Sequence, residues 1–222
     1  MNDRTRNLLL ILLSTAAGCV DAVAFLNAGV FPANMTGNSV VLATSLLHPS
    51  SSAAILSALA LLGFCAGAAA SAWMVHSTDH AWSPRINLAL LAAALLVLGA
   101  TAVVFFSGTE LIVVAILATS AAMGMQSAAV QQLGIAGVAT VFMTGTLTAA
   151  VSRFAGAARE RHEGRPVSAK SPWLPALTWL AYFTGAFLGS LHHVLHTSLP
   201  LALPGLLILV VTLVSGWRLG RA

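Results

Sequence analysis

Long apolar segments follow one another along almost the whole of this 222-residue chain, and they limit what it can fold into. They lie at residues 8–26, 53–75, 86–106, 110–133, 137–156, 173–196 and 201–219. A helix needs about 20 predominantly apolar residues to cross a bilayer, and several of the segments approach that length. The pattern predicts an all-α polytopic protein, a bundle of transmembrane helices.

The composition excludes most other classes of protein. Hydrophobic residues make up 58% of the chain and charged residues 7%, against about 25% charged residues in an ordinary soluble domain. The ten Lys and Arg residues outnumber the six Asp and Glu residues, but they lie between the apolar segments, as in cytoplasmic loops. We therefore expect the lipid bilayer as the main partner and no nucleic acid.

The N-terminal segment has some features of a secretory signal. Arg4 and Arg6 precede an apolar run, and the sequence A-A-G-C ends at Cys19. A cleaved signal is the alternative reading. Because the apolar run continues through 20–26, we expect residues 1–26 to form a retained first helix.

Two stretches of the chain resemble each other, which predicts an internal repeat. The pattern G-V-x-x-x-x-M-T-G at Gly29–Gly37 recurs at Gly137–Gly145, a shift of 108 residues. Upstream, a shift of 106 pairs Ser14, Gly18 and Asp21 with Ser120, Gly124 and Ser127; downstream, a shift of 118 pairs Gly67-Ala68 with Gly185-Ala186. The chain is thus expected to be one membrane domain, 1–222, with repeat halves at 8–106 and 110–219. Such repeats are common in transporters.

The stretch 29–47 leaves two topologies open. Polar residues and Pro32 interrupt it, and only 40–47 is cleanly apolar, which is too short to span a bilayer. Either the chain has six full spans plus two short or broken M-T-G helices, in two inverted sets of three, or it has eight spans in two parallel sets. Lys and Arg favour the cytoplasmic side, so both termini and a basic loop at 157–172 should be cytoplasmic. The six-span form also places Arg85 there, which slightly favours it.

Asp21 is the one acidic residue well inside an apolar segment. A charge at that depth costs about 2.5–3.5 kcal/mol on insertion scales, so an intramembrane acid is by default a functional candidate. Asp21 could carry a proton, bind a cation or accept hydrogen bonds from a solute. The alternative is that it lies near the interface and caps the M-T-G segment.

Neutral polar side chains gather around the two M-T-G stretches. Backbone groups exposed by broken helices must be satisfied by protein, water or ligand, which makes such places natural sites for ions or small polar molecules. The predicted binding site comprises Asp21, Asn34, Thr36, Asn38, Gln126, Thr144 and Thr146. The alternative is that the hydroxyl groups bond to their own helices and the amides bond between helices.

No set of residues indicates catalysis or a metal centre. His192, His193 and His196 form H-H-x-x-H, but no Glu follows the first His as in a zinc protease. Nucleophile elbows, phosphate-binding glycine loops and dinucleotide fingerprints are also absent from the sequence. We expect the protein not to be an enzyme and to need neither cofactor nor metal.

Four sequence blocks together resemble a known family. G-C-V-D-A at 18–22, N-M-T-G-N at 34–38, G-M-Q-S-A at 124–128 and T-V-F-M-T-G-T-L-T at 140–148 are similar to the YoaK family of bacterial membrane proteins. Ser127 departs from the family pattern, in which Asn is expected. The resemblance implies a multi-pass protein of the bacterial inner membrane with no established substrate.

Two hypotheses for function follow. The leading one is a small permease for a polar solute or ion, with Asp21 as the proton or cation carrier and the M-T-G turns as ligands. The other is a non-transporting scaffold or partner subunit whose loop at 157–172 docks a cytoplasmic or lipid partner. A homo-oligomer of such a small chain is compatible with both.

Overall fold

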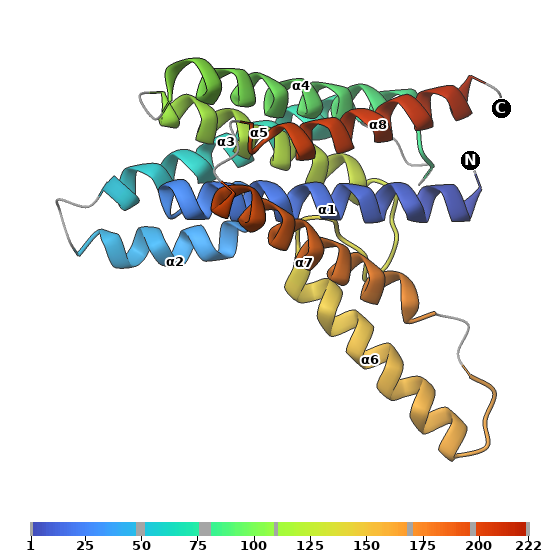
Figure 1. The fold of residues 1–222 in the computed structure, drawn as a ribbon. Helices are drawn as coiled ribbons and strands as arrows, with labels where there is room; N and C mark the ends of the chain where they lie inside the picture. Colours follow the sequence, from blue (N-terminus) through green and yellow to red (C-terminus); the bar gives the residue numbers. More distant parts are fainter. Residues whose placement is uncertain are drawn as a thin grey trace.

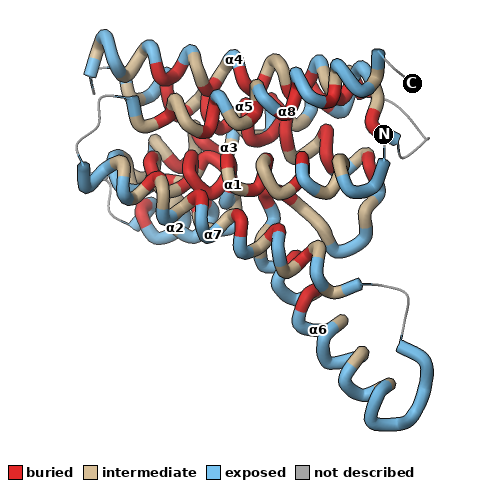
Figure 2. The backbone as a smooth tube through the Cα atoms, turned by 45° about the vertical axis from the view of Figure 1, so that its right-hand side comes forward, coloured by how far each residue is buried: buried red, intermediate tan, exposed pale blue. Residues whose placement is uncertain are grey.

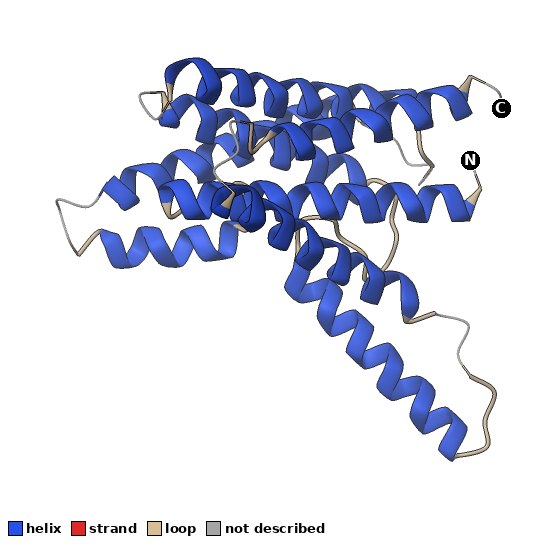
Figure 3. Cartoon of the chain, viewed as in Figure 1, coloured by secondary structure: helices blue, strands red, loops and turns tan. Residues whose placement is uncertain are grey.

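The computed structural model describes residues 2–47, 52–75, 81–108, 111–167, 171–195 and 199–220, and the regular structure within these ranges is entirely helical (Figure 3). The helices are α1 (Asp3–Ala28), α2 (Met35–Ser45), α3 (Ser52–Met74), α4 (Pro84–Ser107), α5 (Ile112–Gln131), α6 (Met143–His162), α7 (Trp173–Val194) and α8 (Ala202–Leu219). The predicted all-α class is confirmed.

Six of these helices, α1, α3, α4, α5, α7 and α8, are long and apolar enough to cross a membrane. The 11 residues of α2 extend for about 16 Å, roughly half of a hydrocarbon core of about 30 Å. Helix α6 has 20 residues but carries Arg153, Arg159 and Arg161. The prediction of six helices that can span a membrane is confirmed, and the 11 residues of α2 are too few for a full crossing.

The prediction was wrong about where α6 ends. Residues 157–162, which were expected to begin the basic loop 157–172, continue α6 to His162. Arg159 also bonds to Glu163 across one helical turn, at 2.7 Å. Helix α6 is therefore neither short nor broken, because its polar second half keeps helical hydrogen bonds that the sequence pattern did not reveal. Only the part that begins at residue 163 forms the connection to α7.

Local sequence signals mark the helix ends around the first span. The Asn2 side chain accepts a hydrogen bond from the backbone N–H of Thr5 at 2.9 Å, which caps the start of α1. At the other end Gly29 adopts a left-handed conformation, with φ of 70°, and its N–H bonds to the Phe25 carbonyl. Glycine adopts this conformation without steric penalty, so α1 stops there and the chain turns back.

Small residues allow two pairs of helices to pack backbone to backbone. A Cβ atom at Gly185 of α7 would lie 1.9 Å from the carbonyl oxygen of Thr15 in α1. A Cβ atom at Gly67 of α3 would likewise lie 1.9 Å from the carbonyl oxygen of Ala121 in α5. Such close approach is how helices associate where lipid gives them no hydrophobic reason to do so. The α1–α7 and α3–α5 pairs form the two tightest contacts of the bundle.

Helices α1 and α5, the first helices of the two predicted halves, run in opposite directions. Gln126, late in α5, bonds to the carbonyl of Leu13 in the first half of α1. The end of α1, at Val23, instead shares a small cavity with Ile112 and Ile116 at the start of α5. An inverted arrangement of two halves requires this antiparallel orientation.

Both chain termini lie at the same end of the bundle (Figure 1). The start of α4 lies there too, because the Asn87 side chain donates a 3.0 Å hydrogen bond to the Thr212 carbonyl in the last part of α8. A side-chain hydrogen bond between Ser215 and Asn87 supports the same contact. Arg85, at the start of α4, is thus at the same end of the bundle as Arg218.

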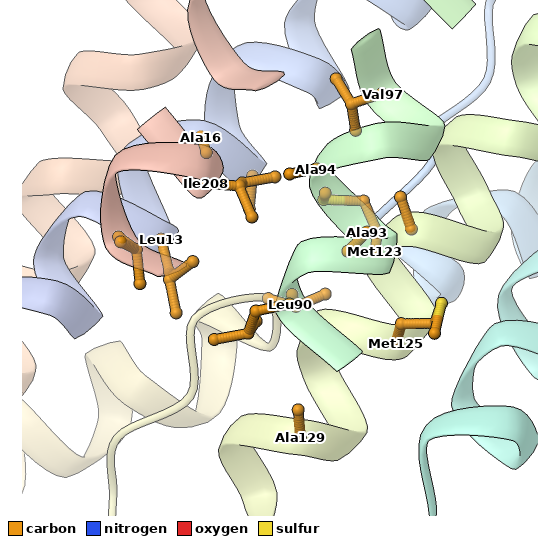
Figure 4. Packing of buried hydrophobic residues seen from close by; sticks show 14 of the residues in the cluster. Leu13, Ala16, Leu90, Ala93, Ala94, Val97, Met123, Met125, Ala129 and Ile208 are labelled. Carbon is orange, nitrogen blue, oxygen red and sulfur yellow. The ribbon is translucent and has the colours of Figure 1, made fainter. Parts of the chain in front are cut away.

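The apolar core lies between α1, α4, α5 and α8. Leu13, Leu90, Met123 and Ile208, one from each of these helices, are fully buried and face one another (Figure 4). Burial is concentrated in this central region, whereas α6 projects from the bundle and is largely exposed (Figure 2). The long, well-packed helices therefore form the frame of the molecule, and the two M-T-G helices α2 and α6 lie at its flank.

Candidate functional site

Each M-T-G helix is held to the turn before it by one buried polar side chain. In the first turn, Asn38 Oδ1 accepts from the Phe31 N–H at 2.9 Å, and Asn38 Nδ2 donates to the Phe31 carbonyl at 2.5 Å. In the second turn, the Thr146 hydroxyl accepts from the Ala139 N–H at 3.1 Å and lies 3.2 Å from the Ala139 carbonyl oxygen. In each turn the two contacting residues are seven positions apart. Thr146 and Ala139 lie 108 positions after Asn38 and Phe31, which is the shift that relates the two M-T-G patterns.

These contacts give Asn38 and Thr146 a structural role. Both side chains are buried, with exposed fractions of 0% and 1%. Each satisfies a backbone N–H and C=O pair that the turn leaves outside any helix, which a buried segment requires. The sequence placed them among the ligands, but their polar atoms already face the turn backbone.

Asp21 lies deep between α1, the first turn and α7. Its exposed fraction is 2%. Oδ1 accepts a hydrogen bond from the Ala33 N–H at 2.6 Å, and Oδ2 accepts one from the Tyr182 hydroxyl at 2.5 Å. The carboxyl group thus joins the backbone just ahead of α2 to a helix of the second half.

The sequence analysis did not include Tyr182 in the predicted binding site. Tyr182 is the only tyrosine of the chain and lies in the apolar α7, where a hydroxyl needs a partner. The repeat offered one signal for it. Tyr182 corresponds to Phe64 at the shift of 118, just as Ser127 corresponds to Asp21 at the shift of 106. The α1–α7 contact thus has a carboxyl and a phenol where the related α5–α3 contact has a hydroxyl and a phenyl ring.

A cavity of about 390 Å³ lies between the two M-T-G turns. Its polar lining comes from both halves of the chain: Asn34, Thr36, Ser127, Gln131, Thr144 and Tyr182. Ala33, Met35, Phe64, Val141, Phe142 and Met143 complete the wall. The described lining contains no charged side chain, so the cavity offers hydroxyl and amide groups on a partly apolar surface.

The structure therefore brings three of the predicted residues together at the cavity: Asn34, Thr36 and Thr144. Asn34 also caps α2, since its Oδ1 accepts from the Gly37 N–H at 3.2 Å. Asp21 is not among the described lining residues, but it bonds to two of them, Ala33 and Tyr182. Asn38, Thr146 and Gln126 are not among its described lining residues.

Gln126 is buried in the contact between α5 and α1. Its Nε2 donates to the Leu13 carbonyl at 3.1 Å and to the Thr140 hydroxyl at 3.2 Å. Its Oε1 is buried without a partner among the described residues. The side chain holds α1, α5 and the second turn together, which is the interhelical role weighed as the alternative.

A second cavity, of about 350 Å³, lies next to the first, along the second turn. The two share Ser127, Gln131 and Phe142. The remaining walls of the second cavity come from the end of α5 and from the connection between α5 and α6. The two cavities are therefore neighbours, separated or joined at the side chains of the three shared residues.

The described residues include no group of three or more His, Cys, Asp or Glu side chains placed to hold a metal ion. His192 and His193 lie in the last turn of α7. His196, the third member of H-H-x-x-H, lies outside the described residues.

Comparison with known proteins identifies a family over most of the chain. The model of the family described as "Protein of unknown function (DUF1275)" matches residues 9–214. The UPF0700 transmembrane protein YoaK of Bacillus subtilis (strain 168) is 31% identical over 188 residues, which cover 84% of this chain and 83% of the relative. No solved structure matches the chain. The chain therefore belongs to the DUF1275 family of membrane proteins, whose function is unknown and which includes YoaK.

Proposed function

We propose that this protein is a permease for a small polar solute, with its binding site in the cavity between the two M-T-G turns. The observation that carries the proposal is the cavity of about 390 Å³, walled by both turns beside a bundle of six membrane-spanning helices. Ligand sites are typically concave and largely apolar, with a few convergent polar groups. The uncharged hydroxyl and amide groups of this lining suit a solute that both donates and accepts hydrogen bonds.

The Asp21–Tyr182 pair would connect a bound solute to the ionisable carboxyl group of Asp21. The Tyr182 hydroxyl donates its proton to Asp21, so the phenol oxygen keeps only acceptor capacity toward the cavity that Tyr182 lines. A donor group of the solute would meet this oxygen. A change in the protonation of Asp21 would alter that contact, which is the proton-carrying role proposed for this residue.

The proposed topology has two inverted halves and six crossings. The antiparallel α1 and α5, and the shared end of the two termini and Arg85, support it. The excess of Lys and Arg at that end would make it cytoplasmic. The protein would then lie in the bacterial inner membrane with both termini inside.

A ligand screen by thermal shift on purified protein tests the site. Binding to the folded state raises the melting temperature by mass action. A solute that stabilises the wild type should fail to stabilise Asp21→Asn, and proteoliposomes carrying that variant should lose coupled uptake of the solute. Thr101→Val is the matched control, because this buried hydroxyl bonds within its own helix to the Val97 carbonyl at 2.9 Å.

Two results would count against the permease. Unchanged uptake by Asp21→Asn would remove the role of Asp21. If no solute in a broad screen stabilises the well-folded wild type, the evidence would favour the scaffold hypothesis instead, in which the projecting α6 and the connection after it dock a partner.

A further inference from the structure

We propose that the second M-T-G turn binds the carboxylate group of a small organic acid, in the place that the Asp21 side chain fills at the first turn. The inference rests on the proposed function and names the class of solute that the cavity between the turns would take. The two turns share a backbone conformation but differ in what lies against it.

The backbone conformation is the same at both turns. Gly29 and Gly137, at the start of the repeated pattern, have φ of 70° and 71°. Asn34 and Phe142, which precede α2 and α6, have φ of −86° and −95°, and ψ is 79° in both. Each pair is related by the shift of 108. The backbone N–H groups of the second turn are therefore arranged like those of the first.

At the first turn these N–H groups hold a carboxyl group. Asp21 Oδ1 accepts a hydrogen bond from the Ala33 N–H at 2.6 Å, two residues before α2 begins. The start of a helix has unpaired N–H groups and a partial positive charge, which favour an anionic group there. The Tyr182 hydroxyl completes the set by donating to Oδ2. The first turn thus shows which chemical group this backbone binds.

At the second turn the carboxyl group is missing. The repeat replaces each member of the first set: Ser127 for Asp21, Val141 for Ala33 and Phe64 for Tyr182. The three replacing residues all line the cavity. Val141 is 6% exposed, and no hydrogen bond joins its N–H or the Ser127 hydroxyl to another described residue. Buried backbone N–H groups nearly always have a partner, so the partner of this one is expected to come from the cavity.

The start of α6 adds further donors to the same wall. Asn34 caps α2 with its side chain, whereas α6 begins at Phe142 without a side-chain cap. Met143 and Thr144, the first two residues of α6, line the cavity. The first N–H groups of a helix have no partner within that helix, which makes a helix start a binding site for anions. A carboxylate bound beside Val141 would therefore also meet the positive end of the α6 dipole.

The charges near the second turn also favour an anion. The Arg153 guanidinium donates to the Ala136 carbonyl at 2.6 Å, and Ala136 lines the neighbouring cavity. Among the described residues, no acidic side chain lines either cavity. Asp21 bonds to two lining residues, but both of its oxygens are already engaged, by Ala33 and Tyr182. The first turn thus has its own carboxyl group, and the second has donors and a nearby positive charge without one.

The rest of the cavity limits the size and character of the acid. Its volume is about 390 Å³, and Phe64, Phe142 and Met35 give it apolar walls, which suit a short hydrocarbon chain. The Tyr182 oxygen keeps acceptor capacity, so a hydroxyl group on the acid would have a partner there. A short carboxylic acid with a hydroxyl group can therefore be held at both ends.

Thermal shift with matched acids and amides tests the carboxylate site. Sodium acetate and sodium lactate should raise the melting temperature of the purified wild type. Acetamide and lactamide, which have a similar shape without the charge, should not. Sodium chloride at the same ionic strength controls for general salt effects. Equal shifts for the acids and their amides, or for the acids and sodium chloride, would overturn the inference.

A double variant copies the first-turn set onto the second turn. Ser127→Asp with Phe64→Tyr gives the second turn its own carboxyl group and a hydroxyl partner for it. Acetate and lactate should then bind at least about tenfold more weakly, because two like charges would share the site. Ser152→Asp is the matched control, since it adds the same charge at an exposed position of α6 outside the lining of both cavities. Unchanged binding in the double variant would contradict the proposed site.

An uncharged variant keeps the test decisive if the double variant does not fold. Ser127→Asn adds an amide oxygen that can accept from the Val141 N–H, so it too should weaken binding of both acids. Equal binding by Ser127→Asn and the wild type would overturn the inference.

The outcomes separate this inference from the permease itself. If a polar solute without a carboxylate stabilises the wild type and neither acid does, the carboxylate site is wrong and the permease stands. If no solute of any kind stabilises the protein, the result counts against both.

Discussion

Tyr182 in α7 donates a 2.5 Å hydrogen bond to Asp21 in α1, across 161 residues of sequence. It is a buried polar contact between two helices whose backbones touch at Gly18 and Gly185. The same carboxyl group accepts from the Ala33 N–H, so this one pair couples the α1–α7 contact to the first M-T-G turn. A disturbance at Asp21 is therefore transmitted both to the helix packing and to the cavity wall.

Removing the Tyr182 hydroxyl should lower the stability of the fold. Tyr182→Phe keeps the ring but leaves one carboxyl oxygen of Asp21 unpartnered and buried, which costs about 1–3 kcal/mol. The melting temperature of the purified protein measures the loss. Asp21→Ala removes the same contact from the other side, so the effects of Tyr182→Phe and Asp21→Ala should not add in the double variant. Additive effects would show that the contact contributes little.

Glycines at the tight helix contacts should not tolerate a methyl group. Gly67→Ala and Gly185→Ala each place a carbon 1.9 Å from a carbonyl oxygen of the neighbouring helix, so the helices must move apart, at a cost of about 1–3 kcal/mol or more. Gly99→Ala in α4 is the matched control, since nothing lies within 4 Å of its Cβ position. That variant should be neutral or gain up to about 1 kcal/mol of helix propensity. Equal melting temperatures for Gly67→Ala, Gly185→Ala and Gly99→Ala would refute the proposed backbone contact.

Asn38 and Thr146 should affect folding rather than binding. Asn38→Ala removes the partner of both the N–H and the carbonyl of Phe31, and Thr146→Ala does the same for Ala139. Each should lower the free energy of unfolding by about 1–3 kcal/mol. The rise in melting temperature caused by a bound solute should persist in both. If either variant has normal stability but no longer binds the solute, that residue belongs to the binding site after all.

Thr36 and Thr144 should show the opposite behaviour. Both are exposed and line the cavity from the two M-T-G helices. Thr36→Val and Thr144→Val should leave the melting temperature of the unliganded protein almost unchanged. Each should weaken solute affinity by about 1 kcal/mol, or about fivefold, through one lost hydrogen bond. Calorimetric titration checks this, with Thr148→Val as the control, because the Thr148 hydroxyl bonds within α6 to the Thr144 carbonyl.

Two engineered cysteines should distinguish six spans from eight. In the six-span topology Leu47, just after α2, lies on the side opposite the termini, and Arg85 lies on the same side as the termini. Eight spans would exchange these two positions. Labelling Leu47→Cys and Arg85→Cys from each face of oriented vesicles gives the answer. A Leu47→Cys thiol that reacts on the side of the termini would show that α2 crosses the membrane.

The fold could be predicted to a large extent because its main signal is local. The apolar segments that became α1, α3, α4, α5, α7 and α8 are visible as runs of sequence, since each must match the thickness of a bilayer on its own. The end of α6 was missed because Arg159 and Arg161 look like loop residues, and only their helical neighbours keep that segment regular. Gly63, Gly67 and Ser71 follow one another at four-residue spacing, which is typical of close helix packing, but the spacing does not identify α5 as the partner of α3.

The sequence predicted the region of the binding site but not which residues line it. The repeated M-T-G pattern located both turns, and Asn34, Thr36 and Thr144 do line one cavity. Sequence alone could not separate them from Asn38 and Thr146, because residues one or two positions apart on a helix face different neighbours. It also could not supply Tyr182, whose importance lies in a contact with Asp21.

By itself the sequence determined that this chain enters a membrane, roughly where its helices run, and where the chain is interrupted by two similar turns. Those properties depend on the composition and spacing of residues along a continuous segment. Each segment must meet the requirements of hydrophobic transfer and backbone hydrogen bonding by itself, so they can be recognised locally. The tertiary structure decided which polar groups are already satisfied and which still face a cavity. That distinction depends on contacts between segments more than a hundred residues apart, such as Asp21 with Tyr182 and Leu13 with Gln126, and no local pattern encodes them.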